Sequence, residues 1–104
     1  MKIKLVNAEM NIEEVIDSLD CRILHFRNKD DKGRIMPNGG ATVISIINNK
    51  TNQINVFSAK CNMKDKFARH KGIDICLRRL VGRLYTKQVE DIISNDGEFK
   101  VMVR

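Results

Sequence analysis

Four arginine residues lie close together in the sequence and have side chains suited to binding phosphate. They are Arg69, Arg78, Arg79 and Arg83, all within one stretch of fifteen residues. A guanidinium group is planar and donates two parallel hydrogen bonds to a phosphate, so it recognises this group better than a point charge does. These four side chains are therefore candidate ligands for a phosphorylated molecule.

A second candidate feature is the run Asn38-Gly39-Gly40, which leads into Thr42. Consecutive glycines allow backbone N–H groups to face an anion without obstruction by side chains. The same run is also ordinary turn chemistry, so both interpretations stay open. Two interpretations of Phe67 also stay possible, because its ring suits stacking on a nucleobase as well as packing in a core. The candidate ligand-binding residues are thus Asn38, Gly39, Gly40, Thr42, Phe67, Arg69, Arg78, Arg79 and Arg83.

The net charge of +6 is concentrated in residues 60–83. This segment holds eight Lys and Arg against two Asp, whereas residues 1–59 sum to +1 and residues 84–104 to −1. Such a concentration is an electrostatic footprint for phosphates, acidic lipids or acidic proteins, although a solvated helix face would show it too. The basic residues do not form one stripe at helical spacing. They therefore favour a few arginines around a pocket over a flat surface for a polyanion.

Enzyme chemistry receives little support from the sequence. There is no G-x-S-x-G, H-E-x-x-H or P-loop motif. A cysteine nucleophile, Cys61 or Cys76, with His70 as its base is an alternative that the residues leave open. The pair Asp30-Asp31 lies among lysines and is more typical of a solvated turn than of an acid–base pair. We expect a binding protein that catalyses no reaction and uses no cofactor.

The cysteines predict free thiols rather than disulfides or a metal site. The chain has an odd number of cysteines, namely Cys21, Cys61 and Cys76, and no two of them form a C-x-x-C motif. Neither His25 nor His70 has ligand spacing to a cysteine, so we expect no metal. No stretch of eighteen apolar residues is present, and the first residues lack the pattern of a secretory signal. We therefore expect a cytoplasmic protein that does not contact membranes.

The hydrophobic pattern predicts one α+β domain over residues 1–104, with a mainly antiparallel sheet, a central hairpin and one main helix packed on it. Val43, Ile44, Ile46 and Ile47 make one hairpin strand apolar on both faces, which is typical of a strand covered on each side. Within the main helix, Gly72 is expected to permit close approach of the helix to the sheet. The expected elements are strands at 2–6, 21–27, 41–48, 53–60 and 98–103, a polar loop at 28–40, and helices at 11–19, 65–85 and from Thr86 to about 94.

The segment from Cys61 also carries a resemblance to known proteins. It reads C-x3-D-x-F-x-R-x2-G-x2-I-x3-R-L and follows a Gly-Gly-x-Thr strand and a hairpin. This pattern resembles small bacteriophage proteins, and among them the first Thoeris anti-defence family, which sequesters cyclic nucleotide immune signals. The resemblance covers about residues 38–84 and does not extend to the first 37 or last 20. Asp74 and Cys76 depart from it, because a basic or polar residue and an alanine are expected there.

The resemblance implies a non-enzymatic homo-oligomer that binds a cyclic ADP-ribose-type or cyclic oligonucleotide signal at subunit interfaces, in the cytoplasm of the host cell. Arg69 and Arg79 would contact phosphate, and Phe67 would stack on a base. The charge distribution alone leaves two other functions open. One is a basic accessory protein that binds nucleic acid, and the other is an inhibitor that binds an acidic host protein.

Overall fold

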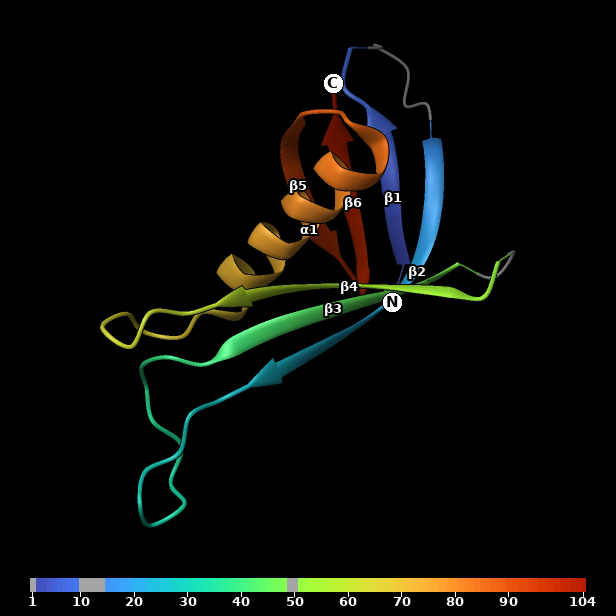
Figure 1. Ribbon diagram of the computed structural model, residues 1–104. Coiled ribbons are helices and arrows are strands. Elements are labelled where there is room, and N and C mark those ends of the chain that lie inside the picture. The colour runs from blue at the N-terminus through green and yellow to red at the C-terminus, as the bar shows by residue number, and fades with distance from the viewer. Residues whose placement is uncertain (1, 10–14, 49–50) are drawn as a thin grey trace.

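The computed structural model describes residues 2–9, 15–48 and 51–104. These residues form six strands and one helix, shown in Figure 1. The elements are β1 (Lys2–Asn7), β2 (Val15–Phe26), β3 (Ala41–Asn48), β4 (Gln53–Lys60), α1 (Arg69–Tyr85), β5 (Val89–Asn95) and β6 (Glu98–Val103).

All six strands belong to one sheet, in the order β4-β3-β2-β1-β6-β5. Neighbouring strands are antiparallel except β1 and β6, which are parallel. The strands at 41–48 and 53–60 have the bounds expected of the central hairpin. The predicted fold class is therefore confirmed: this is an α+β fold with a mainly antiparallel sheet and one helix packed on it.

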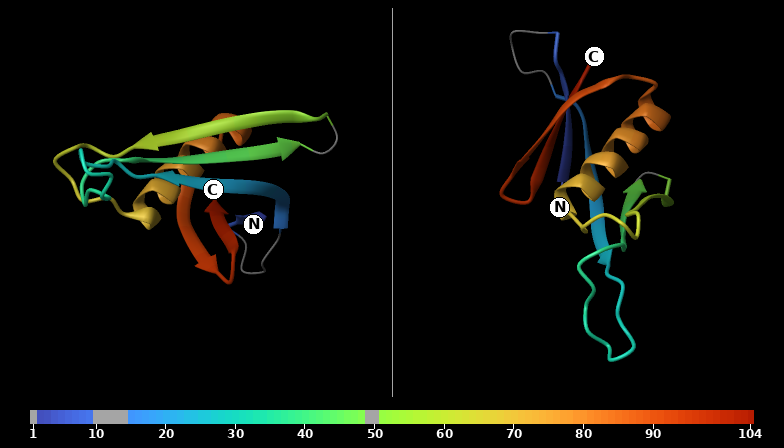
Figure 2. Two further views of the ribbon diagram at one scale, coloured as in Figure 1. Left: turned by 90° about the horizontal axis from the view of Figure 1, so that it is seen from below. Right: turned by 90° about the vertical axis from the view of Figure 1, so that its left-hand side faces the viewer.

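The sheet is strongly twisted, and α1 lies on its inner side. In Figure 1, β3, β4 and the second half of β2 run across the view, while β1, β5 and β6 run up the view. The twelve-residue strand β2 connects the two halves because it pairs with β1 at one end and β3 at the other. Figure 2 shows that α1 lies behind β2, β3 and β4, so the other face of these strands is uncovered.

One hydrophobic core fills the space between α1 and the sheet. Burying apolar side chains of this kind provides most of the favourable free energy of folding. On the strands, alternate residues face the helix, as the pleat of a β-strand requires. The fully buried side chains include Ile3, Leu5, Ile44 and Val101 of the sheet and Cys76, Leu77, Leu80 and Val81 of α1.

Gly72 brings α1 into close contact with β3, as the sequence predicts. A Cβ atom at this position would overlap Thr42 Oγ1 and lie 2.7 Å from Thr42 Cβ. One turn later, Cys76 Sγ lies 3.5 Å from the carbonyl oxygen of Thr42. Small residues at 72 and 76 therefore set the distance between helix and sheet. No helix in the described part of the chain is long and apolar enough to cross a membrane.

The helix predicted over residues 11–19 is wrong where the structure describes it, because Val15 onwards forms β2. The expected cap Asn11 and the following residues to Glu14 lie outside the described residues. The pairing of β1 with β2 shifts register between Leu5 and Val6, so Val6 faces Val15 while Leu5 faces Asp17. Such a bulge adds one residue to a strand and breaks the alternation of its side chains. A strand interrupted in this way produces the apolar spacing of a helix.

The short helix predicted after Thr86 is also wrong, because Val89–Asn95 forms β5. Thr86 is not the start of a helix but the C-cap of α1, in the left-handed conformation with φ 51°. β5 contains its own register shift between Val89 and Asp91, which leaves Val89 and Ile92 both half-buried against the core. α1 itself begins at Arg69 rather than at Asp65.

Candidate anion-binding site

The segment 37–40 before β3 and the segment 61–67 after β4 are joined by backbone hydrogen bonds. Phe67 N–H donates to the Pro37 carbonyl (2.9 Å) and Gly39 N–H to the Asp65 carbonyl (3.1 Å). Cys61 N–H donates to the Gly40 carbonyl (2.8 Å). These bonds fix the loop between β4 and α1 at the ends of the hairpin strands. They therefore determine where α1 begins.

A pocket of about 190 Å³ lies between this loop, the hairpin and the first turn of α1. We call it the basic pocket, because three lysines and one aspartate are among its lining residues. The three lysines give it an excess of positive charge over the single carboxylate of Asp65. Its residues include Thr42, Lys60, Cys61, Asp65, Lys66, Phe67, Lys71, Gly72 and Ile75.

The N-terminus of α1 borders the basic pocket and lacks a side-chain cap. The N-cap residue is Ala68, whose methyl side chain cannot accept a hydrogen bond from the first turn. The first backbone bond of the helix runs from Gly72 N–H to the Ala68 carbonyl (3.1 Å), so the N–H groups of residues 69–71 have no partner within the helix. These groups and the helix dipole favour an anion.

The first turn of α1 carries positive rather than negative side chains. It contains no acidic residue and begins Arg69-His70-Lys71. A cation near a helix N-terminus is unfavourable by about 0.3–1 kcal/mol, because the dipole is positive there. An anion held in the basic pocket would offset this cost for Arg69 and Lys71 together.

Beside the pocket, polar side chains surround Phe67: His25 on β2, Arg27 just after β2, and Thr42 on β3. His25 and Thr42 are directly opposite on β2 and β3, and His25 Nδ1 lies 2.9 Å from the buried Thr42 hydroxyl. The His25 ring also meets Phe67 edge to face, with 5.6 Å between ring centroids. The Arg27 guanidinium stacks 4.7 Å from the Phe67 centroid and donates to the Met36 carbonyl. Its Nε is buried without a partner among the described residues.

The charge state of His25 depends on this environment. Burial lowers the pKa of His25 below 6.5, and the positive charge of Arg69 lowers the pKa further. Neutral His25 is therefore favoured at pH 7. A neutral ring holds the Thr42 hydroxyl without adding a charge beside Arg27 and Arg69.

No protein-family model, curated protein or solved structure matches this chain.

Of the residues predicted to bind a ligand, three lie together at this site. Thr42 and Phe67 line the basic pocket, and Arg69 begins the helix whose first turn borders it. Phe67 is half-buried against Arg27 and His25, and it also lines the pocket. This arrangement joins the hairpin and the start of the basic helix.

The glycine run lies beside the pocket, but it does not form the expected anion nest. Gly39 N–H is already bonded to Asp65, and Asn38 forms an isolated β-bridge with Lys66. Both glycines have positive φ angles, 75° and 107°. A Cβ on Gly40 would lie 2.6 Å from the Phe26 carbonyl oxygen and would crowd the Phe67 ring. The run therefore allows two segments to pack closely, a structural role.

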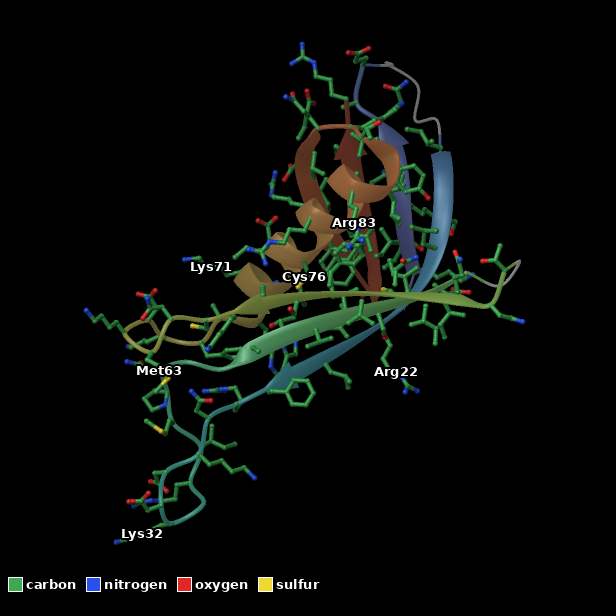
Figure 3. The ribbon with its side chains drawn as sticks, in the orientation of Figure 1. Arg22, Lys32, Met63, Lys71, Cys76 and Arg83 are labelled. Carbon is green, nitrogen blue, oxygen red and sulfur yellow. The ribbon has the colours of Figure 1, made fainter. Side chains whose placement is uncertain are left out.

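The remaining three arginines do not reach the basic pocket. Arg79 donates to the Ser58 carbonyl on β4 (2.7 Å). Arg78 pairs with Asp74 (3.1 Å) and donates to the Val89 carbonyl. Arg83 lies over the Phe57 ring at 5.8 Å. Figure 3 shows Lys71 on the first turn of α1 and Arg83 farther along the helix. These guanidinium groups attach α1 to β4 and β5. The convergence of the four arginines on one pocket, expected from the sequence, is therefore not seen, since Arg69 only begins the helix beside the pocket.

The thiols differ in burial. Cys21 and Cys76 are buried, and burial raises the pKa of both. Cys61 is half-exposed at the basic pocket. His70 lines a separate shallow depression that contains no cysteine, so the structure does not support it as the base for Cys61 or Cys76. No group of three His, Cys, Asp or Glu side chains able to hold a metal ion occurs within the described residues.

Sequence reasoning missed the residues that give the pocket its charge and shape. Lys60, Lys66 and Lys71 belong to the basic segment, but lysine spacing alone does not distinguish a pocket from a solvated face. His25 and Arg27 lie far from the basic segment in sequence. Only the pairing of β2 with β3 brings them to Phe67.

Proposed function

We propose that this protein binds a small phosphorylated nucleotide at the basic pocket and sequesters it without cleaving it. The observation that carries the proposal is the uncapped N-terminus of α1, which borders a pocket lined by Lys60, Lys66 and Lys71. Backbone N–H groups, a helix dipole and ammonium groups together favour an anionic phosphate group. The resemblance of residues 38–84 to phage anti-defence proteins supports a cyclic nucleotide signal as the ligand.

The size of the pocket limits how the ligand is held. A volume of 190 Å³ is below the usual 300–1,000 Å³ of small-molecule sites, so it encloses a phosphate and its nearest atoms rather than a whole nucleotide. The exposed part of Phe67 offers a π-face at the wall of the pocket for the sugar or base. Binding without catalysis is supported by the position of Thr42: its hydroxyl contacts His25, but the Thr42 side chain is fully buried and is not exposed to attack a ligand.

The proposal is tested by mixing the purified protein with cyclic ADP-ribose and cyclic dinucleotides and measuring retained ligand by mass spectrometry. We expect binding at micromolar concentration and release of a ligand of unchanged mass after heating. The double variant Lys66→Gln/Lys71→Gln should bind at least tenfold more weakly. The control is Lys2→Gln/Lys87→Gln, which removes two exposed positive charges outside the basic pocket and should bind within twofold of the original protein.

Three results would contradict the proposal. The first is no retained nucleotide at micromolar concentration, and the second is a released ligand of altered mass, which would indicate an enzyme. The third is binding of single- or double-stranded nucleic acid with a steep salt dependence, which indicates neutralisation of many backbone phosphates. A ligand in a small pocket should instead saturate at a fixed stoichiometry and respond weakly to salt.

A further inference from the structure

The face of β2, β3 and β4 turned away from α1 carries a continuous apolar surface. Cross-strand pairing places its side chains in rows: Ile47 faces Ile54, Ser45 faces Val56, and Val43 faces Leu24. Figure 2 shows these three strands side by side in front of α1, and Figure 3 shows Arg22 projecting away from the helix. We call this surface the open face, and it consists of Arg22, Leu24, Phe26, Ala41, Val43, Ser45, Ile47, Ile54, Val56 and Ser58.

The large side chains of the open face are exposed to an extent that a folded chain normally avoids. Ile54 is 62% exposed, Val56 56% and Phe26 55%, with Leu24 and Ile47 near half. Together they present about 500 Å² of apolar surface, which is at the upper end of the largest patch on a typical monomer. A sheet face of this kind is stable when another layer covers it.

The strand β3 is likewise covered on only one of its two apolar faces. It is apolar on both faces, a pattern typical of strands covered on each side. Ile44 and Ile46 are buried under α1, whereas Ile47 is 49% exposed on the opposite face. Within one chain, therefore, α1 covers one apolar face of β3 and the other apolar face stays exposed.

We propose that the open face binds the open face of a second copy of this chain. Packing of two sheets face to face at about 10 Å is a common way to cover such surfaces. The middle of the surface is complementary to itself in shape, because small residues alternate with larger ones along β3, from Ala41 to Ile47. If a two-fold axis lies between the sheets and across the strands, Ile47 meets Ala41 of the second copy and Val56 meets its Ser58. On the same registers Ile54 meets Lys60 and Leu24 meets Arg22, whose aliphatic stems pack on them while the charged groups reach the rim, and Phe26 meets Asp20.

The distribution of charge on the chain also favours a second copy as the partner at the open face. Two copies with a net charge of +6 repel each other over most of their surfaces. At the open face the rim residues Asp20 and Lys60, together with Arg22, sum to only +1. The open face is therefore a region where two copies can approach with little repulsion.

Nucleic acid fits this surface less well than a protein does. Its exposed large side chains are aliphatic apart from Phe26, so successive bases would find one stacking platform. Covering both patches with some of their polar rim would bury about 1,200 Å² in total, the lower end of specific interfaces. We expect a dimer with a dissociation constant in the micromolar range.

The test is the molar mass of the full chain in solution, measured by sedimentation velocity between 1 and 200 µM. We expect a reversible monomer–dimer equilibrium. Ile54→Lys should weaken the dimer at least tenfold by placing a charge in the contact. The control is Ile35→Lys, the same change at an equally exposed isoleucine, 61%, in the loop at 28–40 outside the open face. It should change the dissociation constant by less than twofold.

A monomer at 200 µM would overturn the proposal, and so would an equal effect of Ile35→Lys and Ile54→Lys. Substitutions at exposed sites rarely unfold a domain, and a thermal melt checks this for each variant. If Ile54→Lys fails to fold, Val56→Lys in the next row makes the same test. A dimer that both open-face variants leave intact would place the contact elsewhere and would also refute the proposal.

Discussion

Replacing Gly72 with alanine should destabilise the protein, although alanine is the better helix former. The added Cβ would overlap Thr42 Oγ1 and lie 2.7 Å from Thr42 Cβ, where ordinary contacts are 3.4–4 Å. Thr42 is fully buried on β3 and its hydroxyl is held by His25, so it cannot move aside. The helix must therefore shift away from the sheet and lose contacts along its buried face.

The expected size of the effect follows from two opposing contributions. Alanine in place of glycine within a helix stabilises by about 1 kcal/mol. Forcing extra atoms into a packed core costs about 1–3 kcal/mol, and the overlap here indicates the upper end. The net loss for Gly72→Ala is therefore about 2 kcal/mol. Gly82→Ala is the control, because a Cβ at this exposed position of α1 meets nothing within 4 Å and should stabilise by about 1 kcal/mol.

Urea unfolding followed by circular dichroism measures this difference. We expect the two variants to differ by about 3 kcal/mol in the free energy of unfolding, or about 12–24 °C in melting temperature for a domain of this size. Combining Gly72→Ala with Thr42→Gly should recover at least 1 kcal/mol relative to the sum of the single changes, because both overlapping atoms, the hydroxyl and the Cβ of Thr42, are removed. A Gly72→Ala protein as stable as Gly82→Ala would refute this account of the helix–sheet contact.

Three further predictions concern single side chains. Arg79→Ala should lower the free energy of unfolding by about 1 kcal/mol, through loss of the bond to Ser58, and leave nucleotide binding unchanged; weaker binding at unchanged stability would instead make Arg79 a ligand. Because the pKa of His25 is lowered on folding, the unfolded chain takes up the proton first, and stability should fall as the pH drops from 6.5 through the folded pKa. An NMR titration midpoint above 6.5 for His25 would contradict this. A thiol reagent should modify Cys61 in the folded protein and Cys76 only after unfolding, because burial raises the pKa of Cys76 and blocks access; equal rates for both would count against the buried position.

The sequence predicted the elements whose pattern is unbroken and failed where a bulge interrupts a strand. The hairpin and the main helix follow from regular alternation and from the spacing of Ile73, Leu77 and Leu80. Val89 and Ile92 are three residues apart and both half-buried, which is helical spacing, but a register shift in β5 produces it. Local periodicity cannot distinguish these cases, because a bulge is defined by pairing with a distant strand.

The candidate site was predictable in position but not in detail. Phe67, Arg69 and Thr42 were selected because the hairpin and the basic segment adjoin in sequence. The roles of Arg78 and Arg79 depend on which carbonyl groups end up beside the helix, and that is decided by tertiary packing. His25 enters the site only through its pairing with Thr42, which no spacing along the chain reveals.

The parallel pairing of β1 with β6 has a consequence for synthesis of the chain. β1 precedes every other element, yet one of its two neighbours in the sheet is the last strand to be made. Folding therefore involves contacts between residues more than ninety positions apart, and such non-local contacts slow the search for the native state. While a ribosome adds about 5–20 residues per second, β1 waits with one edge unpaired until β6 has left the exit tunnel. Mutations that weaken β6 should then reduce the yield of folded protein in cells more than their effect on equilibrium stability indicates.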